Sequence, residues 1–167
     1  MRQLGRIVAL GAVALALVAC GGDDGEASDG VDADAATGRA CEPVGTELED
    51  EAVGTVSVGL DEYAFDPADL HAPVGMVTFE TVNNGDEAHE LAFLPGGGEV
   101  PLTADGAPDE DALGEAGAFE LEAYGPGQEC DGTFALEAGT YTVFCLVEAS
   151  DGKTHLAKGM RGELKVQ

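Results

Sequence analysis

The segment that decides the fold is Thr140-Tyr-Thr-Val-Phe-Cys-Leu-Val147, the strongest β-forming run in the chain. β-Branched and aromatic residues fill it, and the turn pair Ala138-Gly139 precedes it. A run of this composition and length predicts a strand that is buried in a sheet. Because Cys145 lies close to the end of the run, its thiol is expected at one end of that strand.

Shorter β segments lie on both sides of this run. Turn signals such as Asp66-Pro67 and the segment from Asn83 to Asp86 separate them. Residues 99–118 are acidic and irregular, with one helical turn expected near 109–113. About seven short strands in roughly 115 residues predict an all-β fold, an antiparallel two-sheet Greek-key sandwich. The other expected strands are 53–58, 76–82, 89–94, 118–123, 132–137 and 162–167.

The start of the chain has the pattern of an export signal. Arg2 and Arg6 precede a 13-residue apolar run, Ile7 to Ala19, which is too short to span a membrane. The run ends in Leu17-Val-Ala-Cys20, which resembles the lipobox of bacterial lipoproteins, where the Cys carries the lipid. The resemblance implies a lipid on Cys20 and an extracytoplasmic location, on the outer face of the cell membrane or in the periplasm. The alternative is an ordinary secretory signal with a Cys at its cleavage site.

The segment from Cys20 to Ala52 is expected to be a linker. It holds eleven acidic residues, one basic residue (Arg39) and no aromatic residue. Such a composition buries too little apolar surface to offset the entropy of ordering, so an extended and mobile chain is expected. The predicted organisation is therefore a signal peptide at 1–19, an acidic linker at 20–52 and a folded domain at 53–167.

The charge balance excludes one broad class of function. The chain has 7 Lys and Arg against 33 Asp and Glu, which gives a formal net charge of −26. Such a surface repels phosphate backbones, so no nucleic-acid partner is expected. It favours a protein partner with a basic docking surface. We expect the protein itself to be a monomer.

Four residues able to bind a soft metal ion lie at the ends of the predicted strands or in the last loop. His89 opens one strand and Cys145 closes another, while His155 and Met160 follow before the final strand. Two imidazoles, a thiolate and a thioether are the ligand set of a trigonal copper site with a weak axial sulfur. Taken singly, Cys145 and Met160 could be buried apolar side chains and His89 a surface residue. The four together favour one metal site.

These segments resemble the cupredoxins of the plastocyanin type. The segment Asn83 to His89 is similar to the family's Asn-rich approach to its first His, and Gly139 to Cys145 to its Gly-x-Tyr-x-x-x-Cys strand. The segment His155 to Met160 is similar to its His…Gly-Met ending. The resemblance covers residues 53–167 and implies one type 1 (blue) copper per chain, with the four residues above as ligands. It also implies that Asn84 braces the Cys loop from outside the ligand set.

The loop between Cys145 and His155 departs from this pattern. Nine residues separate the two, whereas plastocyanin-type members have a shorter loop. The insert, residues 148–154, is polar and is expected to form a small turn. His71 has no partner residue of this kind and is expected to be a loop residue without a role.

Cys41 and Cys130 are the cysteines left over once Cys20 is assigned to a lipid and Cys145 to the metal. In an exported protein the two are expected to form a disulfide. A pairing of Cys145 with Cys41 or Cys130 remains open from the sequence, and it would leave no copper site.

The resemblance implies a membrane-tethered electron carrier that passes single electrons between extracytoplasmic redox proteins. One alternative is a protein that holds or delivers copper without electron-transfer turnover. Another is an accessory domain that binds no metal. Enzymes of this fold need further His-ligated copper, and only His71 remains for it, so no enzymatic activity is expected.

Overall fold

The computed structural model describes residues 38–167. The expected signal segment 1–19 and the expected lipid site Cys20 lie outside the described residues. In the described part, the helices are all too short or too polar to span a lipid bilayer.

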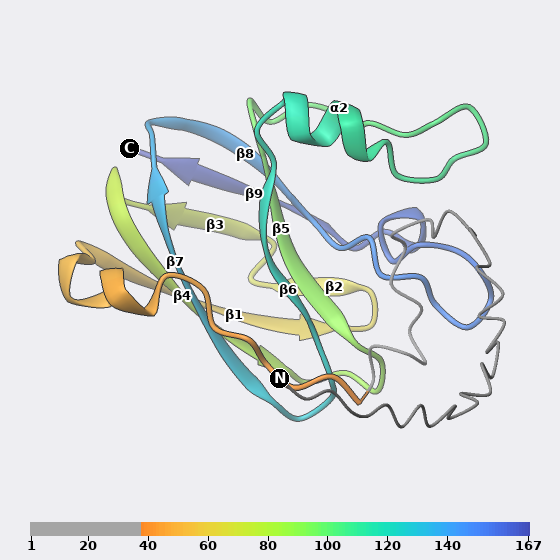
Figure 1. The fold of residues 1–167 in the computed structure, drawn as a ribbon, viewed down its shortest axis with the longest axis horizontal. Coiled ribbons are helices and arrows are strands. Elements are labelled where there is room, and N and C mark those ends of the chain that lie inside the picture. The colour runs from red at the N-terminus through yellow and green to blue at the C-terminus, as the bar shows by residue number, and fades with distance from the viewer. Residues whose placement is uncertain (1–37) are drawn as a thin grey trace, which may run out of the picture.

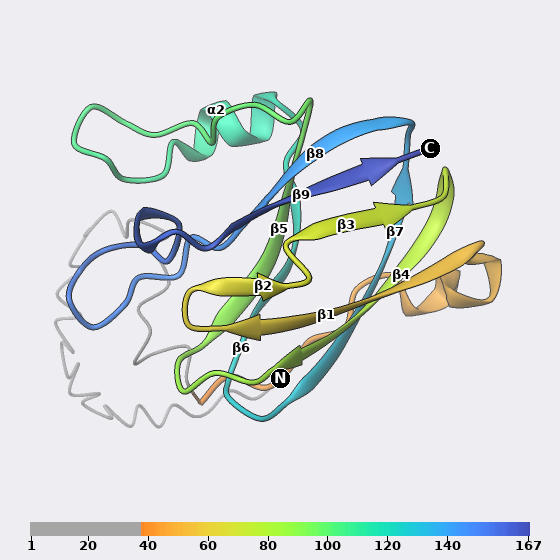
Figure 2. The ribbon, with the colours of Figure 1, turned by 180° about the vertical axis from the view of Figure 1, so that it is seen from behind.

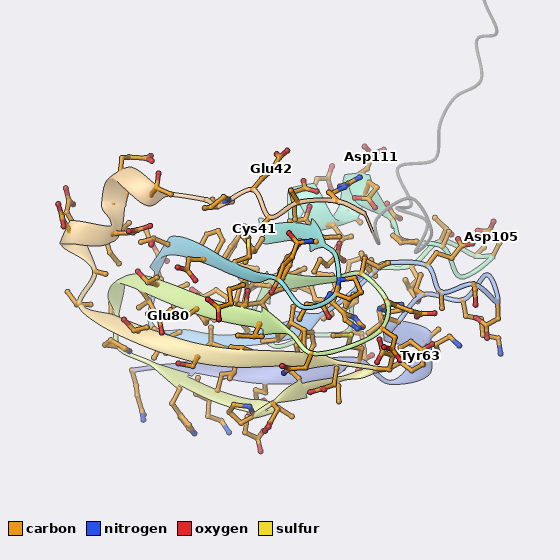
Figure 3. The ribbon with its side chains drawn as sticks, turned by 90° about the horizontal axis from the view of Figure 1, so that it is seen from below. Cys41, Glu42, Tyr63, Glu80, Asp105 and Asp111 are labelled. Carbon is orange, nitrogen blue, oxygen red and sulfur yellow. A yellow bond between two sulfur atoms is a disulfide. The ribbon has the colours of Figure 1, made fainter. Side chains whose placement is uncertain are left out.

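Nine strands in the described part form two sheets that pack face to face as two layers (Figures 1 and 3). One sheet has the order β2-β1-β4-β7 and the other the order β3-β9-β8-β5-β6. The expected two-sheet β-sandwich is thus confirmed. The first sheet contains β1 (Gly54–Asp61), β2 (Ala64–Asp66), β4 (Gly75–Asn83) and β7 (Glu129–Leu136). The second contains β3 (Asp69–Ala72), β5 (His89–Pro95), β6 (Phe119–Tyr124), β8 (Gly139–Phe144) and β9 (Arg161–Val166).

The sheets are mixed rather than wholly antiparallel. β1 pairs with β4 in parallel, and β3 pairs with β9 in parallel. The cause is the crossing that follows β2: the chain leaves the first sheet and enters the second as β3 (Figure 2). It then returns as β4 alongside β1, so these two strands are not joined by a hairpin and can run in the same direction.

Strand β3 contains His71, which corrects the expectation that His71 lies in a loop. The strand has four residues, and their burial alternates, with Leu70 and Ala72 inside and His71 exposed. It lies at the edge of its sheet, and Pro73 follows it directly. A short edge strand bounded by a proline gives a weak sequence signal.

The core lies between the sheets, and a second apolar cluster lies outside one of them. In β4, inward-facing residues such as Val77 and Phe79 alternate with outward-facing ones. In β5, by contrast, six successive residues are buried. Its inner face packs in the core, while the outer residues Ala92 and Leu94 pack with Leu113 of α2 (Glu110–Glu115). The acidic segment before β6 therefore covers part of the outer face of the second sheet, beside β5 and β6 (Figure 1).

The chain contacts the sandwich before residue 53, within the segment expected to be a linker. Val44 forms a bridge with Gly132, and Cys41 is joined to Cys130 of β7 by a disulfide (Figure 3). A 3₁₀ helix, η1 (Thr46–Glu51), follows. Residues 38–52 are thus described in contact with the domain rather than extended away from it, because the disulfide and the bridge fix them to β7. Among residues 38–167, Cys145 has no disulfide partner, and its side chain is buried.

Candidate metal centre

Three of the expected ligands meet because two neighbouring strands end at the same edge of one sheet. His89 is the first residue of β5, and Cys145 directly follows the last residue of β8. The two strands pair antiparallel, with Ala92 opposite Phe144, so the start of β5 lies beside the end of β8. His155 follows in the loop after β8, which lies at the same end of the sandwich as the loop before β5 (Figure 1).

The donor atoms of these three residues face one another. His155 Nδ1 lies 3.4 Å from Cys145 Sγ and 3.0 Å from His89 Nδ1. One donor atom from each of the three residues lies within 4.8 Å of the other two, and each residue is fully buried. The structure therefore brings together two imidazoles and one thiol that are far apart in the sequence.

The long loop after Cys145 closes on itself, so His155 returns to the Cys. The His155 amide donates to Val147 O and the Leu156 amide donates to Cys145 O, both at 2.8 Å. Between these two contacts, residues 148–154 form the expected turn, with Glu148 and Thr154 bridged. Cys145 and His155 thus meet although nine residues separate them, with Cys145 Sγ 3.4 Å from His155 Nδ1.

Met160, the expected axial ligand, lies at the end of the same loop. Its side chain is fully buried, and its amide donates to His155 O at 2.9 Å. Gly159, with φ 109°, precedes it after the 3₁₀ helix η2 (Leu156–Lys158). This left-handed conformation favours glycine and turns the chain inward at Met160. The role of its thioether as a ligand stays a prediction.

The arrangement fits copper. A neutral imidazole has one nitrogen with a free lone pair, and the two Nδ1 atoms, 3.0 Å apart, are close enough to bind one cation together. Two imidazoles and a thiol in a buried pocket suit a soft or borderline cation, whereas magnesium and calcium prefer oxygen ligands.

The comparison with known families agrees with this chemistry. The family model of copper-binding proteins of the plastocyanin/azurin family matches residues 52–167. The chain belongs to this family. Copper is accordingly the cofactor of this cupredoxin, and the cluster of His89, Cys145 and His155 fits a type 1 copper site.

Solved structures show the same fold. Auracyanin B is 24% identical, with a TM-score of 0.53, over 79% of this chain and 99% of its own. A dithionite-reduced auracyanin from the photosynthetic bacterium Roseiflexus castenholzii is 25% identical, with a TM-score of 0.50, over 70% of this chain and 98% of its own. None of the curated proteins matches the chain.

Asn84, expected to brace the Cys loop, does not occupy such a position in this cupredoxin. Its side chain is exposed, whereas that of Asn83 is fully buried. The Asn83 amide donates to Glu87 O and Tyr124 O and accepts from the Gly85 amide. Asn83 therefore fixes the turn that leads to His89. Asn84 follows the last residue of β4, where the chain turns outward, whereas Asn83 still lies in the strand and faces inward.

Glu90 is the residue that holds the Cys loop. Its side chain is buried, and its carboxyl group accepts a hydrogen bond from the backbone N–H of Leu146, directly after Cys145. The sequence signal was available: Glu90 is the one charged residue in the apolar run of β5. Lone acids in such runs require a partner, which Leu146 supplies.

Two further glutamates contact the ligand rings from outside, and sequence reasoning missed both. Glu62 Oε1 lies 3.2 Å from His89 Nε2, and Glu87 Oε2 lies 3.0 Å from His155 Nε2. A carboxylate can only accept here, so each Nε2 carries the hydrogen and each Nδ1 keeps its lone pair for the metal. Tyr63 packs edge-on against the His155 ring, with the centroids 4.9 Å apart.

Burial controls the protonation of the site. It raises the pKa of the Cys145 thiol, and the Glu90 carboxyl group adds to this rise. Burial, and then the charge of His89, lower the pKa of His155 to about 4. Burial also lowers the pKa of His89. At neutral pH both imidazoles are therefore neutral, as metal binding requires, and the thiol keeps its proton until a cation displaces it.

The pKa values of two carboxyl groups next to the ligands, Glu90 and Glu62, shift in opposite directions. Burial raises the pKa of Glu90 to about 8, and the neighbouring Glu120 contributes to this rise. For Glu62, burial acts to raise the pKa, but hydrogen bonds from the amides of Glu87 and Asp86 and from His89 outweigh it, and the pKa is lowered. Glu62 therefore faces His89 as a carboxylate, whereas Glu90 accepts from Leu146 as a neutral acid at neutral pH.

Proposed function

We propose that this protein carries single electrons between redox proteins outside the cytoplasm. The observation that supports the proposal most strongly is the buried donor set of His89, Cys145 and His155, with all donor atoms within 4.8 Å. Bound copper supplies a one-electron couple at this site. Thiolate favours Cu(I) and imidazole suits both oxidation states, so the donor set is compatible with cycling between them.

The protein's contribution is to keep the ligands in place. His89 lies in a paired strand, and backbone hydrogen bonds from His155 and Leu156 close the loop onto Val147 and Cys145. Glu90 fixes the amide that follows Cys145. Ligands held in this way move little between the two oxidation states, which favours rapid electron transfer.

The His155 end of the sandwich is the expected exit for the electron. His155 itself is fully buried, so its own edge is not the surface that meets a partner. Glu87 and Tyr63 cover it, and the Glu62 side chain lies nearby with 31% of its surface exposed. Acidic groups at this end favour a partner with a basic docking surface. Electron transfer to such a partner should slow as ionic strength rises.

The membrane tether rests on the sequence before residue 38. The lipobox-like segment ending at Cys20 and the acidic residues after it support a lipid anchor followed by a spacer. In cells that process lipoproteins, the full chain should partition with membranes, and Cys20→Ser should release it. Release of the unaltered chain would contradict the anchor.

Copper delivery is the alternative function. The reversibility of the copper redox couple distinguishes it from electron transport. The copper-loaded protein should give a reversible one-electron wave and fast self-exchange. His155→Ala should abolish the wave, while His71→Ala, which removes an exposed imidazole on β3, should retain it. A protein that binds one copper but cycles slowly or irreversibly would instead support delivery.

A further inference from the structure

We propose that Glu62 and Glu87 are positioning residues that orient the two ligand imidazoles and lower the reduction potential of the site. The effect on the potential rests on the proposed function, whereas the orientation of the rings can be tested without copper. Each carboxylate contacts the ring nitrogen that faces away from the metal pocket.

Glu87 acts on His155 from a turn that is itself held in place. Its Oε2 lies 3.0 Å from His155 Nε2 and also accepts from the Tyr63 hydroxyl at 3.2 Å. Tyr63 lies at the end of the molecule where the loop after β8 is found (Figure 3), and Lys158 Nζ lies 4.7 Å from its ring centroid. With only 23% of the Glu87 side chain exposed, the contact is largely shielded from water. This shielding strengthens the electrostatic effect of the carboxylate on the ring.

Glu62 acts on His89 in the same way, from the turn after β1. Its Oε1 accepts from the amides of Asp86 and Glu87, at 2.6 and 2.8 Å, as well as from His89 Nε2 at 3.2 Å. Three donors on one oxygen leave the carboxylate little freedom. Glu62 therefore links the turn that precedes His89 to the His89 ring itself.

Gly85 is independent evidence that the place beside His89 is shaped for this carboxylate. A Cβ added at Gly85 would overlap the Glu62 carboxylate and lie 2.7 Å from His89 Nε2. Because Gly85 has no side chain, the Glu62 carboxylate can occupy this space. Gly85→Ala should therefore disturb the contact between Glu62 and His89, because the new methyl group would press on both the carboxylate and the ring.

The charge of the two carboxylates explains why we expect them to lower the reduction potential. A carboxylate that accepts from Nε2–H makes the imidazole a stronger donor at Nδ1. Two negative charges near the site also favour Cu(II), which carries more positive charge, over Cu(I). Both effects stabilise the oxidised form, so both lower the potential.

The test separates charge from orientation with two substitutions at each position. Glu→Gln keeps a hydrogen-bond acceptor and removes the charge, whereas Glu→Ala removes both. Asp86→Asn is the matched control, since Asp86 is an exposed acid in the same turn whose side chain makes no ring contact within the described residues. Two readouts are needed: the potential of the copper-loaded protein, and the ¹⁵N chemical shifts of the ring nitrogens in the copper-free protein.

We expect both rings of the copper-free protein to carry their hydrogen on Nε2, and Glu87→Ala and Glu62→Ala to lose this preference. Glu87→Gln should raise the potential by about 59 mV, a tenfold change in the ratio of Cu(I) to Cu(II) affinity. Asp86→Asn should raise it much less.

The proposal is overturned if Asp86→Asn raises the potential as much as Glu87→Gln, or if neither changes it. It is also overturned if the hydrogen resides on Nδ1 in the unaltered copper-free protein. Failure to bind copper or to cycle would remove the proposed function instead, and the ring-nitrogen shifts would still decide whether the carboxylates orient the imidazoles.

Discussion

The backbone N–H of Leu146 donates to the carboxyl group of Glu90, and this bond connects residues 56 positions apart in the chain. Each partner directly follows a residue of the candidate copper site: Glu90 follows His89, and Leu146 follows Cys145. This hydrogen bond therefore joins the ends of β5 and β8 beside His89 and Cys145, beyond the last paired residues of the two strands.

Replacing Glu90 should show how much this bond contributes to stability. Glu90→Leu leaves the buried N–H of Leu146 without a partner, which costs about 1–3 kcal/mol of unfolding free energy. Glu90→Gln keeps an acceptor and should cost much less. Chemical denaturation of the copper-free protein measures both. Equal losses in the two variants would show that the hydrogen bond is not the cause.

The pH dependence of stability should carry the signature of Glu90. Its pKa is about 8 in the folded protein, against 4.5 as the ordinary value. Between these values the folded protein holds a proton that the unfolded chain has lost. Stability therefore falls as pH rises through this window, by up to about 1.4 kcal/mol per pH unit.

The Glu90→Gln variant is the reference for this measurement. In both the unaltered protein and the variant, His89 and His155 also change the stability with pH, in the direction opposite to Glu90. Both histidines have lowered pKa values, so they stabilise the folded state less as the pH falls below 6.5. The difference in unfolding free energy between the two proteins should isolate Glu90. If the unfolding free energies of the unaltered protein and of Glu90→Gln change in parallel from pH 5 to pH 8, the raised pKa does not belong to Glu90.

Removing the disulfide should destabilise the domain without altering the copper site. Cys41 and Cys130 are 89 residues apart, and a crosslink over such a loop contributes about 4–5 kcal/mol by restricting the unfolded chain. Cys41→Ser with Cys130→Ser should lower the melting temperature and retain the visible spectrum of the copper-loaded protein. A changed spectrum would mean that the bridge also shapes the metal centre.

Much of the fold and the three close ligands could be predicted from the sequence, because both leave local patterns. The run that contains Cys145 has strand composition, and His155 and Met160 follow it before the last strand. The parallel pairing of β1 with β4 could not be predicted in this way. It depends on where the chain crosses between sheets, which no local pattern encodes.

The outer carboxylates were missed for a different reason. Glu62 and Glu87 are two of 33 acidic residues, and nothing in their local sequence distinguishes them from solvated surface acids. Their role depends on side-chain contacts with His89 and His155 that only the folded turn creates. Charged groups around a site are therefore hard to identify from sequence in a strongly acidic protein.

The most direct test of the copper centre is a Cu(II) titration of the copper-free protein followed by visible and EPR spectroscopy. We predict one equivalent of copper and an intense visible thiolate-to-copper band, which Cys145→Ser abolishes. A colourless protein at one equivalent of bound Cu(II), or a band that persists in Cys145→Ser, would contradict the site formed by His89, Cys145 and His155.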